Sequence, residues 1–109
     1  MIQITVTNKG ELIYAIEAKG HSGYAEAGSD IICSAVSTLI QNAEKGLKEL
    51  LHISTKFSLD VNKPYLKITL PDNLNEQLTH DSQIILKSTM LGLYDLADSY
   101  PKYISIKEN

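Results

Sequence analysis

The sequence predicts an α+β fold of two layers, in which two amphipathic helices cover one face of a mostly antiparallel sheet. Apolar and polar residues alternate in two pairs of short segments, which is the pattern of β-hairpins with one buried face. Two longer segments repeat their apolar residues every three or four positions, as amphipathic helices do. With a short closing strand the order is ββαββαβ, and the length of 109 residues fits one domain covering residues 1–109.

The chain is predicted to open with a β-hairpin. Residues 2–7 alternate between apolar and polar, and the turn at 8–10 contains Asn and Gly, which tolerate a positive φ. In the second strand, over 12–18, the even-numbered positions are apolar and share one face. Ile13 and Ala15 then point to the other face of the sheet, where we expect a second copy of the chain to pack.

Segment 20–30 lacks an apolar period and is predicted to be a loop, with Gly20, Gly23 and Gly28 as turn residues of positive φ. A helix follows from Ile32, capped by Ser29 or Asp30. Its apolar face comprises positions 32, 36, 39, 40, 43, 47, 50 and 51. The remaining predicted elements are a strand over 53–59 with its odd-numbered residues inward, a turn at 61–64, a strand over 66–70, a helix carried by Leu86, Met90, Leu93 and Ala97, and a last strand at 104–106.

Composition excludes several classes of protein. The net charge is −3, and all ten basic residues are Lys, so the chain lacks the side chain best suited to bidentate contacts with phosphate or guanine. We therefore expect no direct binding of nucleic acid. No apolar run approaches the ~20 residues that span a bilayer, and the first residues do not resemble a secretory signal. With one cysteine and no expected export, we predict a cytoplasmic protein that does not enter a membrane.

The single cysteine is the main chemical feature. Cys33 falls in the first turn of the predicted helix, where unpaired backbone N–H groups lower the pKa of a thiol. His21 lies at the start of the glycine-containing loop, and a loop that returns to its own helix can bring this imidazole over the thiol. The same N–H groups can hold an oxyanion once a carbonyl is attacked. This arrangement indicates nucleophilic catalysis.

Each of these residues also has a simpler interpretation. A free cysteine is more often a small buried apolar residue, and a loop histidine often only ends a strand. Asp30 is expected to cap the helix, although one carboxylate can also orient an imidazole. Ser37, one helical turn beyond Cys33 on the same face, is by default a small packing residue.

A resemblance favours the catalytic interpretation. The stretch from Gly20 to Ser37, GHSGYAEAGSDIICSAVS, closely resembles the signature of the ribosomal-processing cysteine protease (Prp) family: a Gly-His pair, a glycine-containing loop, Gly-x-Asp-Ile-Val-Cys and a run of small residues ending in Ser. The resemblance implies that His21 is the catalytic histidine and Cys33 the nucleophile, with Asp30 and Ser37 as accompanying polar residues. It further implies a homodimer whose substrate is a large-subunit ribosomal protein with a short N-terminal extension, and no cofactor.

Other hypotheses are weaker. Gly20–Gly23 fits the GxxG loop of KH domains, but that loop joins two helices and this segment follows a strand. No Gly-Lys-Ser/Thr follows the glycines, which excludes a P-loop. His52 and His80 are too far in sequence from His21 and Cys33 to supply a close pair of zinc ligands, so no metal site is expected. The main rival is a non-catalytic, ribosome-associated binding module in which Cys33 and His21 only pack.

Overall fold

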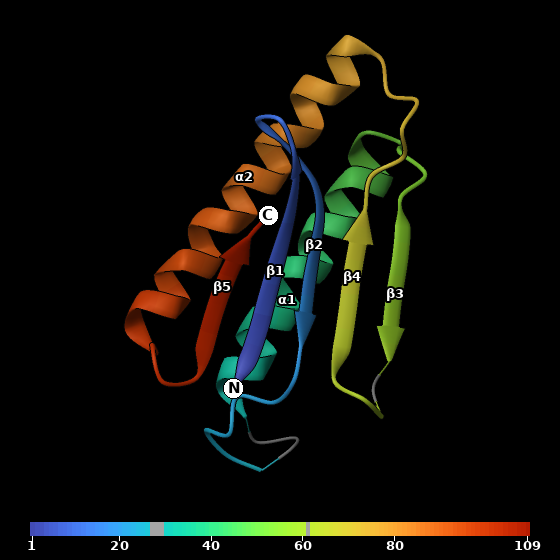
Figure 1. Ribbon diagram of the computed structural model, residues 1–109. Coiled ribbons are helices and arrows are strands. Elements are labelled where there is room, and N and C mark those ends of the chain that lie inside the picture. Colours follow the sequence, from blue (N-terminus) through green and yellow to red (C-terminus); the bar gives the residue numbers. More distant parts are fainter. Residues whose placement is uncertain (27–29, 61) are drawn as a thin grey trace.

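A computed structural model describes residues 1–26, 30–60 and 62–109. In these residues the chain forms five strands and two α-helices, the first of which continues into a π-helical stretch (Figure 1). Their bounds are β1 (Ile2–Lys9), β2 (Leu12–Lys19), α1 (Ile31–Lys45), the π-helix η1 (Gly46–Leu50), β3 (Lys56–Asp60), β4 (Tyr65–Thr69), α2 (Glu76–Ser99) and β5 (Ile104–Glu108). This confirms the predicted order ββαββαβ. The predicted turn residue Gly28, the alternative helix cap Ser29 and the turn position Val61 lie outside the described residues.

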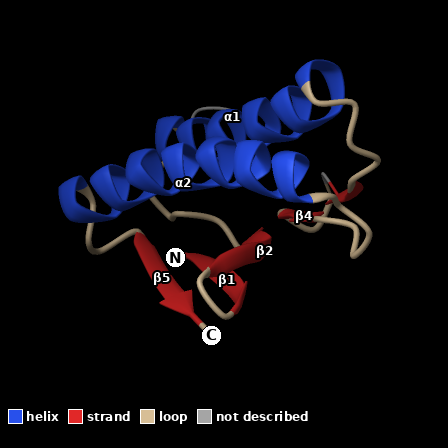
Figure 2. Cartoon of the chain, turned by 90° about the horizontal axis from the view of Figure 1, so that it is seen from above, coloured by secondary structure: helices blue, strands red, loops and turns tan. Residues whose placement is uncertain are grey.

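The strands form one sheet in the order β3-β4-β2-β1-β5. Three of its four pairings are antiparallel, and only β1 and β5 run parallel. Figure 2 shows α1 and α2 lying side by side in one layer, with the strands in the other. The fold class is therefore the predicted two-layer α+β arrangement, with both helices on one face of a mostly antiparallel sheet.

The core lies between the two layers because the apolar faces of the strands and helices meet there. Val6 pairs with Ile16 and Ile4 with Ala18 across β1 and β2, and all four side chains are buried. The helices cover them with side chains at helical spacing, among which Ile32, Val36 and Ile40 of α1 and Leu86, Met90 and Leu93 of α2 are buried. The apolar periods in the sequence thus predicted the buried faces of both helices.

The position of Ile13 differs from the prediction. The register of β1 and β2 shifts between Thr7 and Asn8, so that Tyr14 is an extra residue in β2. Such a bulge reverses the alternation of side chains that follows it. Ile13 therefore lies in the core, 7% exposed, and not on the open face. The side chain of Gln83 in α2 fixes this irregular stretch, because its amide bonds both the N–H (2.8 Å) and the carbonyl (2.9 Å) of Ile13.

The second hairpin begins later than predicted. The strand expected from residue 53 forms only over Lys56–Asp60, and it is an edge strand paired with β4 alone. Residues 52–55 form the connection from the helix instead, and His52 has a positive φ of 55°. Leu59, predicted to face inward, is 50% exposed because no further strand covers this edge.

The first helix also departs from its predicted apolar face near its end. Leu50 is 75% exposed although it fits the helical spacing. The π-helical stretch widens the last turn, and this rotates the side chains away from a period of 3.6 residues. Within the ranges 1–26, 30–60 and 62–109, neither helix has an apolar stretch of the length that a bilayer crossing needs.

Candidate active site

The start of α1 is fixed by Asp30. Its backbone is extended, and its Oδ1 accepts hydrogen bonds from the backbone N–H groups of Ile32 and Cys33, both at 3.0 Å. This is the geometry of a helix N-cap, and it confirms the capping predicted for Asp30. Cys33 is therefore the third residue of the helix, in the first turn, as its place in the sequence indicated.

Gly20 ends β2 and turns the chain toward the start of α1. Its φ is 95°, and a Cβ atom at this position would lie 2.7 Å from the carbonyl oxygen of Met1. Its N–H donates to the carbonyl of Pro64 at 2.9 Å. Only glycine meets both the positive φ and the close approach of the Met1 backbone. Residues 20–26 lie at the end of the sheet where β1 starts (Figure 1).

One cavity of about 230 Å³ collects the residues that the sequence singled out. His21, Asp30, Cys33 and Ser37 all line it, so the structure brings together the whole predicted site. His21 is exposed and Cys33 is half-buried. In the described part of the chain no hydrogen bond joins these two side chains, and Asp30 is not bonded to His21. The opposite wall comes from the β3–β4 hairpin and was not predicted; it includes Leu59, Asp60, Pro64, Tyr65 and Leu66.

Ser22 is the residue that sequence reasoning missed. It is 3% exposed, and its hydroxyl donates to the carboxylate of Asp30. Its own backbone N–H donates to Sγ of Cys33 at 3.3 Å, and its Oγ accepts the N–H of Tyr24 at 3.0 Å. A serine beside a loop histidine carries no recognisable signal in a single sequence, because loops are rich in serine for many reasons.

The acidity of the thiol is opposite to the prediction. Burial, together with the nearby Asp30 carboxylate, raises the pKa of Cys33 above its ordinary value, although the Ser22 N–H acts in the other direction. Burial also acts to raise the pKa of Asp30, but the hydrogen bonds from Ser22, Cys33 and Ile32 outweigh it and hold that pKa below its usual value. The carboxylate is thus charged at neutral pH, and it disfavours a second negative charge on Cys33.

The helix start also differs from the oxyanion site that we expected. The N–H groups of Ile32 and Cys33 are taken by the Asp30 side chain, and the N–H of Ser34 donates to the Asp30 carbonyl at 3.1 Å. These three groups already have acceptors, so none of them is free to hold an oxyanion in this conformation.

Ser37 faces the cavity one turn beyond Cys33, and its Oγ accepts a hydrogen bond of 2.6 Å from the side-chain amide of Gln41.

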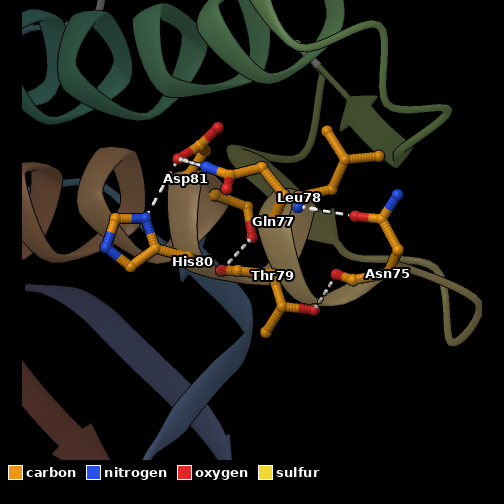
Figure 3. A network of polar contacts seen from close by, with 7 residues as sticks. Asn75, Gln77, Leu78, Thr79, His80 and Asp81 are labelled. Atoms are coloured by element: carbon orange, nitrogen blue, oxygen red, sulfur yellow. Dashed lines mark hydrogen bonds and ion pairs between the residues drawn. The ribbon is translucent and has the colours of Figure 1, made fainter.

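The two remaining histidines, His52 and His80, lie outside the cavity. Figure 3 shows His80 near the start of α2, where its Nδ1 lies 3.0 Å from a carboxylate oxygen of Asp81. The same view shows Asn75 capping this helix by accepting the Leu78 N–H at 2.8 Å.

Comparisons with known proteins identify the family of this chain. The family model described as "Cysteine protease Prp" matches residues 1–105. The ribosomal processing cysteine protease Prp of Mycoplasma pneumoniae is 32% identical over 99% of this chain and 95% of its own. Among solved structures, the ribosomal processing protease Prp of S. aureus with a covalently linked product peptide superposes with a TM-score of 0.87 at 22% identity, covering all of both chains. SMU.848 from Streptococcus mutans gives 0.84 at 30% identity, covering 99% of this chain and 93% of the other.

These matches define a cysteine protease. Its cysteine and one of its histidines line the same cavity. The chain belongs to the cysteine protease Prp family.

Proposed function

We propose that this protein is an endopeptidase that removes the short N-terminal extension of a large-subunit ribosomal protein, with Cys33 as nucleophile and His21 as general acid and base. The observation that carries the proposal is that His21 and Cys33 line the same cavity at the start of α1. Nucleophilic catalysis by a thiol needs a base within reach and room for a peptide beside it. The names of the relatives supply the substrate class, since they are ribosomal processing proteases.

The raised pKa of the thiol determines the first step. Because Cys33 is protonated at neutral pH, His21 takes the thiol proton as the sulfur attacks the scissile carbonyl. The resulting imidazolium then donates this proton to the leaving amine, and a thioester remains on Cys33. Water, deprotonated by His21, hydrolyses the thioester, and the proton returns to the thiol. His21 must move from its exposed position to contact the sulfur, which substrate binding brings about.

The cavity is suited to hold part of a peptide. On the hairpin side Leu59, Pro64 and Leu66 give it an apolar surface beside Asp60 and Tyr65. The α1 side carries Cys33, Ser34 and Ser37. Pockets of this kind bind an apolar side chain and direct the polar backbone toward the reacting groups. The S. aureus relative has been solved with a substrate peptide and with a covalently linked product peptide, which supports a peptide substrate here.

The direct experiment incubates the purified protein with a ribosomal protein that carries its N-terminal extension and measures the product mass. We expect loss of the extension by one internal cut, and no change on addition of EDTA because the mechanism uses a thiol. An unchanged mass after prolonged incubation, with a folded enzyme, would contradict the proposal. Because the proposed substrate is a ribosomal protein, we place this activity where ribosomes assemble, in the cytoplasm.

One observation favours the alternative of a non-catalytic, ribosome-associated binding module. Cys33 has a raised pKa and no bond to His21, as a packing cysteine would. The rate of alkylation by iodoacetamide separates the two hypotheses. A catalytic Cys33 is alkylated by iodoacetamide in the folded protein, whereas a packing cysteine is alkylated only in denaturant.

We further propose a homodimer, which the family resemblance supports. The open sheet face offers a partner less apolar surface than the sequence predicted, because Ile13 lies in the core and this face carries polar side chains such as Thr5, Glu17 and Lys67. Sedimentation at micromolar concentration tests the proposal. A particle of the chain mass, 12.1 kDa, would exclude a dimer under those conditions.

A further inference from the structure

Ser22 bonds two of the residues that line the candidate active site, Asp30 and Cys33. Its hydroxyl donates to Asp30, its N–H donates to Sγ of Cys33 at 3.3 Å, and its Oγ accepts the N–H of Tyr24. A side chain that is 3% exposed and makes these bonds is held in one place, since breaking them would leave buried polar groups without partners.

The Asp30 carboxylate joins Ser22 to the helix. One oxygen accepts the Ser22 hydroxyl, and the other accepts the N–H groups of Ile32 and Cys33 at 3.0 Å each. The loop residue next to His21 is therefore connected to the residue Cys33 twice, directly through the sulfur and indirectly through the carboxylate. Because consecutive Cα atoms lie about 3.8 Å apart, fixing Ser22 also limits where the His21 backbone can lie.

We propose that Ser22 is a positioning residue, which holds the loop carrying His21 on the helix turn carrying Cys33 and keeps its own backbone N–H on the Cys33 sulfur. This role rests on the proposed function of His21 and Cys33 as the catalytic pair. Ser22 contacts the reacting sulfur only through its backbone, and its hydroxyl acts through Asp30. The hydroxyl also keeps a donor on a buried carboxylate that otherwise faces the thiol.

Removing the Ser22 hydroxyl should raise the pKa of the Cys33 thiol. A hydrogen bond from the Ser22 N–H favours the thiolate, whereas the negative charge of Asp30 disfavours it. Without the hydroxyl, the loop loses its connection to Asp30, the N–H leaves the sulfur, and the carboxylate loses the donor that offsets its charge. The loss of the N–H from the sulfur and the loss of the donor on the carboxylate both make the thiolate harder to form.

The experiment measures the rate of Cys33 alkylation by iodoacetamide in the folded, full-length protein between about pH 6 and pH 10.5, a range that spans the ordinary thiol pKa. In Ser22→Ala we expect the alkylation midpoint to rise and the rate at pH 7.5 to fall about tenfold, the effect of losing one hydrogen bond to a charged group. Ser22→Thr, which keeps the hydroxyl, is expected to restore most of the rate. Ser82→Ala is the matched control, because Ser82 is also buried and hydrogen-bonded, at 3.0 Å to the Thr79 carbonyl, but lies in α2.

An unchanged alkylation profile in folded Ser22→Ala would overturn the proposal, as would an equal shift in Ser82→Ala. If Ser22→Ala does not fold, nuclear magnetic resonance of the wild-type protein decides. The amide proton of Ser22 must then shift with the same midpoint as the Cys33 thiol, and an amide insensitive to that titration would exclude the contact. These readouts do not require peptide cleavage. A shifted profile in a protein that cuts no substrate would therefore refute the protease function alone.

Discussion

One carboxylate oxygen of Asp30 accepts the backbone N–H of Cys33 at 3.0 Å, and the same carboxylate adds to the effect of burial in raising the pKa of the Cys33 thiol. A single side chain thus stabilises the helix on which Cys33 sits and opposes ionisation of the Cys33 thiol. These two effects are separable by mutation, because capping needs an oxygen acceptor whereas the effect on the thiol needs a negative charge.

The first prediction compares Asp30→Asn with Asp30→Ala. The asparagine keeps an oxygen for the N–H groups of Ile32 and Cys33 but removes the charge, so we expect a lower thiol pKa, faster alkylation at neutral pH and nearly unchanged stability. The alanine also removes the charge, but it removes the acceptor of the Ser22 hydroxyl as well, so the thiol pKa should fall less than in Asp30→Asn. It also loses the cap and should cost about 1–2 kcal/mol in the free energy of unfolding. Urea denaturation and iodoacetamide kinetics measure the two effects. Alkylation of Asp30→Asn at the wild-type rate would show that the charge is not what restrains the thiol.

The second prediction concerns the proposed catalytic pair. Cys33→Ala and His21→Ala should each abolish cleavage of the extended ribosomal protein and leave the fold intact, since His21 is exposed and the cysteine is replaced by another small residue. Cys33→Ser should also be inactive, because a hydroxyl is far less acidic than a thiol. The double variant should be barely worse than either single one, as residues that act as a unit are not additive. Circular dichroism verifies the fold.

His52→Ala and His80→Ala are the controls for this pair. Neither histidine lines the cavity at Cys33, so both variants should cleave at close to the wild-type rate. Cleavage by a rigorously purified Cys33→Ala protein would end the hypothesis of a thiol protease.

The third prediction uses two glycines with a positive φ. Gly20 and Gly10 have φ values of 95° and 63°, but only at Gly20 would a Cβ approach another backbone, the Met1 carbonyl oxygen at 2.7 Å. Gly10→Ala should therefore cost about 1 kcal/mol of stability, the penalty of the backbone conformation alone. Gly20→Ala should cost clearly more and should reduce cleavage, because β1 and the end of β2 must separate. Thermal melts of both variants measure this, and equal losses would contradict it.

The fourth prediction concerns alkaline pH. The Tyr94 hydroxyl in α2 donates to the Glu108 carboxylate in β5, and this hydrogen bond raises the pKa of Tyr94 to about 12. Because the folded pKa lies above the ordinary value near ~10, the stabilisation is fully present below that pH and is lost as the pH rises toward the folded pKa. Tyr94→Phe should abolish this loss. Absorbance of the phenolate during a pH titration measures the pKa of Tyr94. In Glu108→Gln this pKa should return to its ordinary value, and an unchanged pKa in that variant would exclude the pairing.

Most of the fold is predictable because it depends on local patterns. The periods of Val36 and Ile40 in one helix, and of Leu86 and Leu93 in the other, are visible in the sequence and correspond to buried faces. The burial of Ile13 cannot be predicted from the sequence, because a bulge depends on how two strands pair. It also depends on the Gln83 side chain, which hydrogen-bonds the displaced backbone. Pairing is a property of the folded chain and not of either segment alone.

The candidate site could also be predicted from the sequence only in part. Asp30 and Cys33 are close in sequence, so the helix cap and the position of the thiol follow from local rules. The acidity of Cys33 does not, because the helix terminus argues for a low pKa while burial and the charge of Asp30 prevail in the opposite direction. Likewise, Ser22 and the wall that includes Tyr65 join the site only through the three-dimensional approach of distant segments.

The parallel pairing of β1 with β5 makes the end of the chain the last part to join the fold. Ile2, which forms part of the cavity wall near Cys33, pairs with Ile104, and its N–H donates to the carbonyl of Tyr103 at 2.8 Å. Partners so distant in sequence form late, because a long loop must close before their contact stabilises anything. During biosynthesis, His21 and Cys33 therefore leave the ribosome well before β5, the strand that pairs with Ile2 of the cavity wall. A chain interrupted before Ile104 would carry the proposed catalytic pair, His21 and Cys33, without the strand that pairs with β1.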